Sequence, residues 1–179
     1  MMTRMGLFLL ILLVFPLAAC GPALAAIDAD DQTIISTALP AADQCPVTQP
    51  PEPPFIPPEP YPPEAPYGDF WFGTNDLWVL LSPDGRWHSL PKDEHGYGQK
   101  LLWFREGYDM TVEQRPDITI RGQQIDGDET FEQTGATNGN HPDVGMFMLT
   151  GVTVPNAGCW EITGYYRKTS LSFVVWVEP

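Results

Sequence analysis

The sequence predicts an all-β protein: an antiparallel β-sandwich over residues 69–179, preceded by a signal peptide and a proline-rich extended segment. Short runs of β-branched and aromatic residues recur from Phe70 onward, turn residues separate them, and no amphipathic helix of useful length interrupts them. These roughly 110 residues are enough for one domain of common size. The hydrophobic fraction of 43% supplies the core that such a domain needs.

Local patterns define the expected strands. The apolar run LWVLL at 77–81 is short enough for a strand buried on both faces, and the turn at 82–85 predicts a hairpin with residues 86–90. Residues 118–125 alternate, with Arg121 on the face opposite the isoleucines, and Gly122 is interpreted as a bulge. The remaining expected strands are residues 70–74, 100–105, 145–154, 160–166 and 171–177.

The N-terminus has the layout of an export signal. Arg4 precedes an apolar run that is too short to span a bilayer comfortably, and the run ends in LAACG at 17–21. That string resembles the bacterial lipobox, which implies removal of residues 1–19 and lipidation of Cys20. The alternative is ordinary cleavage after Ala25 or Ala26. With Cys20 lipidated, we expect an exported protein anchored to the outer face of the bacterial cell membrane, or to the outer membrane in a diderm.

Two segments connect this signal to the predicted sandwich. Residues 20–44 are small and polar, which predicts a flexible linker. Residues 45–68 form the proline-rich segment, in which 11 prolines between 46 and 66 favour polyproline II. We expect a rigid spacer. The alternatives are a ligand for an aromatic groove, since Pro54–Pro57 satisfies PxxP, and packing onto the sandwich through Phe55, Ile56 and Tyr61.

The cysteines fit an exported protein. If Cys20 carries lipid, Cys45 and Cys159 remain, and an even pair in an oxidising compartment predicts a disulfide. Such a bridge closes a loop of roughly 115 residues.

Two resemblances support these expectations. The string PNAGCWEI at 155–162 combines a loop with the start of an aromatic strand, and a closing hairpin follows it. This succession resembles the last two strands of immunoglobulin-like domains. More broadly, the chain resembles an uncharacterised family of bacterial secreted or lipid-anchored proteins, which implies no assigned activity. That likeness rests on the strings CPVT at 45–48, FWFGTNDLWVLL at 70–81, DEHGYGQK at 93–100, FREGYD at 104–109, RPD at 115–117, ATN at 136–138, GCWEITG at 158–164 and LSFVVWV at 171–177.

Charge and motifs restrict the function. The net charge of −14 argues against nucleic acid as a partner, because phosphate binding needs a basic patch. The common hydrolase, zinc-protease and nucleotide-binding motifs are absent. SLPK at 89–92 has the letters of S-x-x-K, but Pro91 disfavours the helical turn which that chemistry needs. We therefore predict neither an enzyme nor a bound cofactor.

Metal-ligating residue types are present without a metal-binding spacing. The histidines and nearby carboxylates, which we expect to be loop residues, are His88, His95, His141, Asp93, Glu94 and Asp143. The acidic string DGDETFE at 126–132 is interpreted as a solvated loop, with weak calcium binding as the alternative. Its candidate ligands are Asp126, Asp128, Glu129 and Glu132.

Aromatic residues are the main functional hint. If Leu77 and Val79 face the core, Trp78 points to the opposite side, where an exposed ring stacks on sugars or receives a partner. The candidate ligand-binding residues are Trp78, Trp87 and Tyr97; the alternative is that these rings are buried. The sequence thus predicts a binding or structural module of the cell envelope, with a polysaccharide or a surface protein as ligand. The alternative is a secreted hydrolase or its accessory domain.

Overall fold

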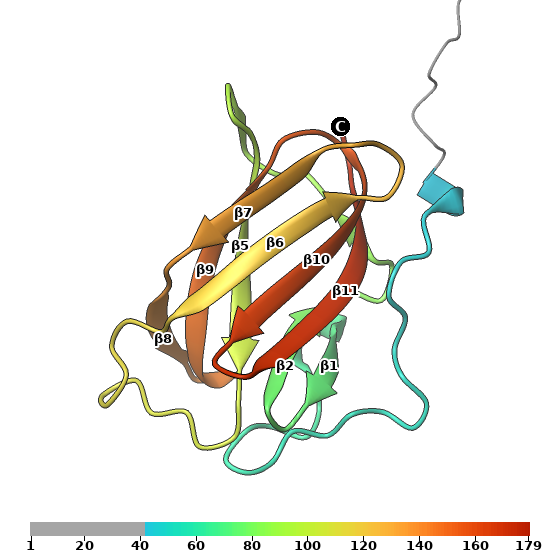
Figure 1. The fold of residues 1–179 in the computed structure, drawn as a ribbon. Helices are drawn as coiled ribbons and strands as arrows, with labels where there is room; N and C mark the ends of the chain where they lie inside the picture. The colour runs from blue at the N-terminus through green and yellow to red at the C-terminus, as the bar shows by residue number, and fades with distance from the viewer. Residues whose placement is uncertain (1–41) are drawn as a thin grey trace, which may run out of the picture. The chain divides into compact units, whose positions relative to one another are not determined.

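The computed structural model describes residues 42–179. The predicted signal peptide, Cys20, the alternative cleavage sites and most of the 20–44 linker lie outside the described residues. The all-β prediction is confirmed for the described part, which contains two β-sheets, two short 3₁₀ turns and no α-helix (Figure 1). The 3₁₀ turns are η1 (Ala42–Gln44) and η2 (Pro66–Gly68).

One sheet has six strands. Five of them lie in the order β1-β2-β5-β9-β8, and β4 pairs with β5 beside this path. All pairings in this sheet are antiparallel. The strands are β1 (Phe70–Thr74), β2 (Leu77–Leu81), β4 (Lys92–Asp93), β5 (Gly96–Phe104), β8 (Thr137–His141) and β9 (Gly145–Val154).

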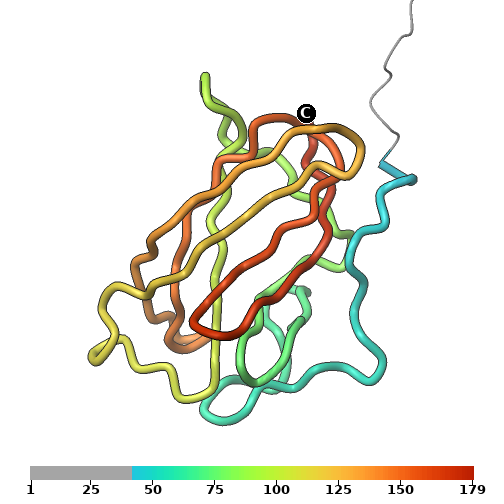
Figure 2. Tube along the Cα trace, in the orientation of Figure 1, coloured from blue at the N-terminus to red at the C-terminus, as the bar shows by residue number. Residues whose placement is uncertain are grey.

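The second sheet has five strands in the order β3-β11-β10-β6-β7 and faces the viewer in Figure 1. Its strands are β3 (Arg86–Trp87), β6 (Ile118–Gln124), β7 (Thr130–Thr134), β10 (Gly158–Tyr166) and β11 (Thr169–Val177). The tube in Figure 2 shows the chain passing repeatedly from one sheet to the other, and the last hairpin joins β10 to β11 within the five-stranded sheet.

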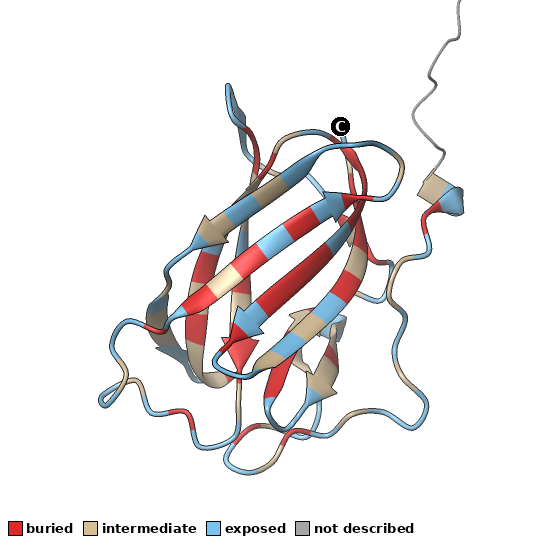
Figure 3. Ribbon diagram, viewed as in Figure 1, coloured by how far each residue is buried: buried red, intermediate tan, exposed pale blue. Residues whose placement is uncertain are grey.

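The main core lies between the sheets. Buried and less buried residues alternate along β6, as the bands in Figure 3 show, whereas β10 and the end of β11 are buried at most positions. The expected shared face of the last strand is confirmed, since Phe173, Val175 and Val177 are all core residues. The fully buried Trp103 reaches across from β5 and donates from Nε1 to Thr150 Oγ1 at 3.0 Å. The Trp103 ring fills the position that a Cβ atom at Gly164 would occupy, so only glycine fits there.

Two local predictions are wrong. The turn at 82–85 forms, with the Gly85 amide donating to Ser82 O at 2.9 Å, but residues 86–90 do not return along β2. Instead β3 crosses to the other sheet, where Arg86 and Trp87 pair in parallel with β11. This parallel pair is an exception to the predicted antiparallel sandwich. Gly122 is not a bulge either, because the pairing of β6 with β7 and β10 runs through it without interruption. A glycine fits there because the Phe131 ring fills the space of a side chain.

The proline-rich segment packs against the outer side of the six-stranded sheet, so the expected rigid spacer is wrong and the alternative, packing onto the sandwich, is what the structure has. Tyr61 is only 6% exposed and lies edge-on to Trp78 and Phe104, with ring centroids 5.0 and 5.8 Å apart. Its hydroxyl donates to Met146 O at 3.1 Å. Phe55 adds a third ring, 5.8 Å from Trp78. This second aromatic core exists because the segment covers what would otherwise be a large apolar patch.

The predicted disulfide is confirmed. Cys45 and Cys159 are joined, with their Cα atoms 5.5 Å apart and a sequence separation of 114. Both residues are buried beside Trp176 on the outer side of β11. The chain then continues along the edge of β11, where the Thr48 amide donates to Val174 O at 2.9 Å. The start of the proline-rich segment is thus fixed to the five-stranded sheet both covalently and by hydrogen bonds.

Candidate functional site

The predicted ligand-binding aromatics do not form an exposed strip. Trp78 is 0% exposed, Trp87 7% and Tyr97 5%. Trp78 does point away from the main core, as the alternation in β2 predicts, but the proline-rich segment covers it. Trp87 and Tyr97 belong to the main core, and Lys92 lies over the Tyr97 ring. The prediction that these rings meet a ligand directly is therefore wrong.

The outward side of the five-stranded sheet is apolar around Cys159 and Trp176, where the disulfide covers it, and polar over the rest of β6, β7, β10 and the start of β11, a surface that we call the polar face. The register puts Arg121 between Glu132 and Thr163, and puts Gln123 beside Glu161 in the next row. The side chains of the polar face are Thr119, Arg121, Gln123, Thr130, Glu132, Thr134, Glu161, Thr163, Tyr165, Ser170 and Ser172. Most of them are exposed, in the bands that Figure 3 shows facing the viewer.

The centre of the polar face is hollowed and ordered. A depression of about 410 Å³ lies over β6, β7 and β10, with Arg121, Glu132 and Tyr165 among its lining residues. Arg121 Nε donates to Glu132 Oε2 at 2.6 Å, and this hydrogen bond raises the pKa of the arginine. The same guanidinium lies 5.1 Å above the Tyr165 ring. Glu132 and Tyr165 thus both contact Arg121 and favour this orientation of its exposed side chain, which lowers the ordering cost of binding.

The chemistry of this surface suits a polyhydroxylated ligand. The guanidinium of Arg121 and the amide of Gln123 donate hydrogen bonds, whereas the carboxylates of Glu132 and Glu161 accept them. Tyr165 is 41% exposed and offers a ring for stacking beside these polar groups. Thr163 and Ser172 hydroxyls lie 2.8 Å apart and add groups that both donate and accept.

Arg121 and Tyr165 are not among the candidates that the sequence offers, and Glu132 is one only as a calcium ligand, although the sequence contains part of the signal. The alternation in 118–125 already places Arg121 on the outward side, but nothing local indicates that Glu132 and Tyr165 lie next to it. Their proximity comes from the pairing of β6 with β7, the next strand along the chain, and with β10, which is separated from β6 by three strands.

The metal candidates are not brought together. Asp126 Oδ2 accepts from the Cys159 amide at 3.0 Å, and Glu132 is paired with Arg121, so two of the four proposed calcium ligands point to different partners. His88, His95 and His141 each lie beside a different carboxylate. Within residues 42–179, no three histidine, cysteine, aspartate or glutamate side chains group as a metal site.

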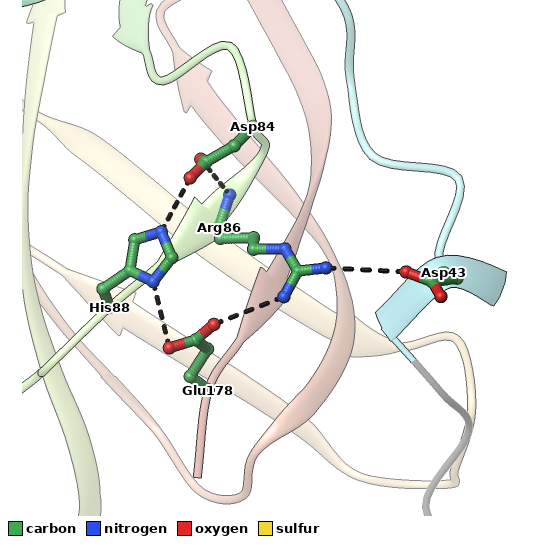
Figure 4. Close-up of polar contacts among 5 residues, drawn as sticks. All are labelled: Asp43, Asp84, Arg86, His88 and Glu178. Carbon is green, nitrogen blue, oxygen red and sulfur yellow. Dashed lines mark hydrogen bonds and ion pairs between the residues drawn. The ribbon is translucent and has the colours of Figure 1, made fainter.

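A separate ionic cluster connects β3 to the C-terminus (Figure 4). His88 Nε2 lies 2.7 Å from Asp84 Oδ2, and its Nδ1 lies 3.0 Å from Glu178 Oε2. Glu178 also accepts from Arg86 Nη1 at 3.4 Å, and Arg86 reaches Asp43 at 3.6 Å. Both nitrogens of the histidine are engaged by carboxylates, so this cluster is an arrangement for holding a charged imidazolium.

We expect this cluster to make the stability of the fold depend on pH. The hydrogen bond to Asp84, followed by that to Glu178, raises the pKa of His88 above its ordinary 6.5. The stabilisation from charged His88 is therefore fully present below about pH 6.5 and is lost as the pH rises through the folded-state pKa. Urea unfolding near pH 6 and near pH 8 should show wild-type protein more stable at the lower pH. His88→Gln should shrink that difference.

His95→Gln is the matched control for this pH effect. The His95 side chain is 76% exposed, and its one carboxylate neighbour, Glu94, is also exposed and lies 3.6 Å away. It should keep the pH difference of the wild type. An equal loss of the difference in both variants would contradict the role of the His88 cluster.

Comparisons with protein-family models, curated proteins and solved structures found no match. No helix in the described part of the chain is both long and apolar enough to cross a membrane. The candidate site therefore rests on the geometry of the polar face alone.

Proposed function

We propose that the protein is an extracytoplasmic, lipid-anchored binding module of the bacterial cell envelope, and that the polar face holds an envelope polysaccharide. One observation carries this proposal: Arg121 is held between Glu132 and Tyr165 at the centre of an exposed, hollowed sheet face. Exposed, ordered donors and acceptors beside an aromatic ring favour a ligand made of sugar rings and hydroxyls.

The strand order supports an immunoglobulin-like sandwich within this proposal. In such domains strands A, B, E and D form one sheet, and G, F and C form the other, which gains C′ in variable-type domains. The order β2-β5-β9-β8 corresponds to A-B-E-D, and β11-β10-β6-β7 corresponds to G-F-C-C′. The polar face is then the outward side of the G-F-C-C′ sheet.

The export and anchoring parts of the proposal rest on the N-terminal sequence and on the disulfide. The apolar run and the LAACG string support lipidation at Cys20. The Cys45–Cys159 bridge is consistent with a compartment that lets disulfides persist.

Binding to oligosaccharides prepared from bacterial envelope polysaccharide tests the proposal. Arg121→Gln and Tyr165→Ala should each weaken binding by about tenfold or more in calorimetry, because each removes a charged donor or a stacking ring. Both positions are at the surface, so the free energy of unfolding should change by less than about 1 kcal/mol.

Matched controls separate the polar face from a general surface effect. Lys100→Gln removes an exposed charge on the other sheet, and Tyr67→Ala removes a ring that is 70% exposed in the proline-rich segment. Both should bind as wild type does. Equal weakening in all four variants, or release of sugar products during the titration, would contradict a non-catalytic site on the polar face.

A further inference from the structure

The end of the sandwich at the β10–β11 hairpin holds a second depression, away from the centre of the polar face. Three chain segments form it: the β1–β2 turn, residues 105–106 after β5, and the hairpin tip at 166–169. Its volume is about 560 Å³, and an adjoining hollow of about 420 Å³ shares Arg105 and Arg167 with it. The Glu106 amide donates to Asn75 O at 2.9 Å, which fixes two of these segments to each other.

Positive charge gathers at this end of an acidic protein. Arg105, Arg167 and Lys168 line the larger depression, and they are three of the eight lysines and arginines in residues 42–179. Two carboxylates, Asp76 and Glu106, line it as well. The lining of the larger depression thus has one more cationic than anionic side chain, and Glu113 in the adjoining hollow pairs with Arg167. Within the described residues Lys168 and Arg105 form no ion pair, so both remain available to an anion.

Arg167 has a left-handed backbone conformation, which usually favours glycine or asparagine. The pairing of Tyr166 with Thr169 leaves Arg167 and Lys168 as a two-residue hairpin loop, and Arg167 has φ of +56°. Glycine or asparagine is the usual choice for a left-handed position in such a turn. A non-glycine residue held in this region carries backbone strain, and such strain gathers at functional sites.

The side chain of Arg167 is also held in place. Its Nη2 donates to Glu113 Oε2 at 2.8 Å, and its guanidinium lies 5.0 Å from the centre of the Tyr166 ring. The Tyr166 hydroxyl donates to the same carboxylate at 2.5 Å, and burial followed by this contact raises its pKa to about 12. Glu113 is thus occupied by two donors, and Arg167 retains further N–H groups for a ligand.

We propose that this hairpin end binds an oxyanion, a carboxylate or a phosphate group, between Arg105, Arg167 and Lys168. Guanidinium groups recognise both anions through paired N–H donors, and lysine adds a point charge. Asp76 and Glu106, which also line the depression, favour a ligand with a single local anionic group over a dense polyanion. This inference does not rest on sugar binding at the polar face, because the two depressions share no lining residue.

The test is an amide chemical-shift titration of the full chain with inorganic phosphate, with glucuronate and with glucose. We expect saturable shifts at residues 75–76, 105–106 and 166–169 with one or both anions and none with glucose. Whether phosphate or glucuronate binds more tightly identifies the class of ligand. Arg167→Asn keeps a residue that tolerates the left-handed turn and should weaken anion binding by about tenfold.

Lys100→Gln removes the same charge from the opposite sheet and should leave anion binding unchanged. Shifts that do not saturate, or that persist equally in Arg167→Asn, would overturn the inference. The polar-face variants distinguish the two proposals: Arg121→Gln should weaken oligosaccharide binding while leaving the anion titration at the hairpin end intact.

Discussion

Replacing both bridging cysteines, Cys45→Ala with Cys159→Ala, is expected to destabilise the fold by about 2–5 kcal/mol. The bridge spans 114 positions, so its removal frees a very long loop in the unfolded chain. It also releases the start of the proline-rich segment, which then depends on the hydrogen bonds of Thr48 to β11. Thermal unfolding should show a midpoint lower by roughly 10 °C or more.

A matched change in the same segment tests whether the covalent bond is responsible. Thr48→Ala removes the side-chain contact to the Val174 amide and should cost only about 1 kcal/mol. Wild-type protein unfolded under reducing conditions should behave as the double cysteine variant does. A double variant with wild-type stability would mean that the bridge contributes nothing to the fold.

Tyr61→Ala is expected to cost about 3–5 kcal/mol, as truncation of a buried aromatic residue does. The ring contacts Trp78 and Phe104, and its hydroxyl donates to the backbone of Met146. Its loss leaves a cavity over Trp78, which is otherwise fully buried. Urea unfolding followed by tryptophan fluorescence measures both the lost stability and the new exposure of that ring.

Tyr67→Ala supplies the comparison, because Tyr67 lies in the same segment but is 70% exposed. Its hydroxyl donates a 2.6 Å hydrogen bond to Asp143 at the surface. It should change stability by less than about 0.5–1 kcal/mol. If Tyr61→Ala were as mild as Tyr67→Ala, the proline-rich segment would be a spacer and not part of the core.

The local pattern predicted most of the larger strands. Apolar runs and alternation locate β1, β2, β9, β10 and β11, and the turn residues at 82–85 locate the turn after β2. The strands that the pattern missed are polar or very short. β7, for example, reads TFEQT within the acidic string, and its place in the sheet is decided by its partner β6.

The errors at the predicted ligand-binding aromatics arise because residues distant in the sequence cover them. Alternation places Trp78 on the side opposite Leu77, which is right, but it does not indicate that Tyr61 and Phe55 lie on top of it. The same limit applies to β3, whose parallel pairing with β11 depends on a residue pair about 90 positions apart. Arg121, Glu132 and Tyr165 likewise become a site only once three separate strands are in register.

The central claim is that the polar face holds the ligand, and amide chemical-shift mapping with a bound envelope oligosaccharide tests it most directly. We predict the largest shifts at residues 119–123, 130–134 and 161–165, with loss of these shifts in Tyr165→Ala. Shifts confined to the proline-rich segment around Tyr61, with the three polar-face strands unchanged, would contradict the claim.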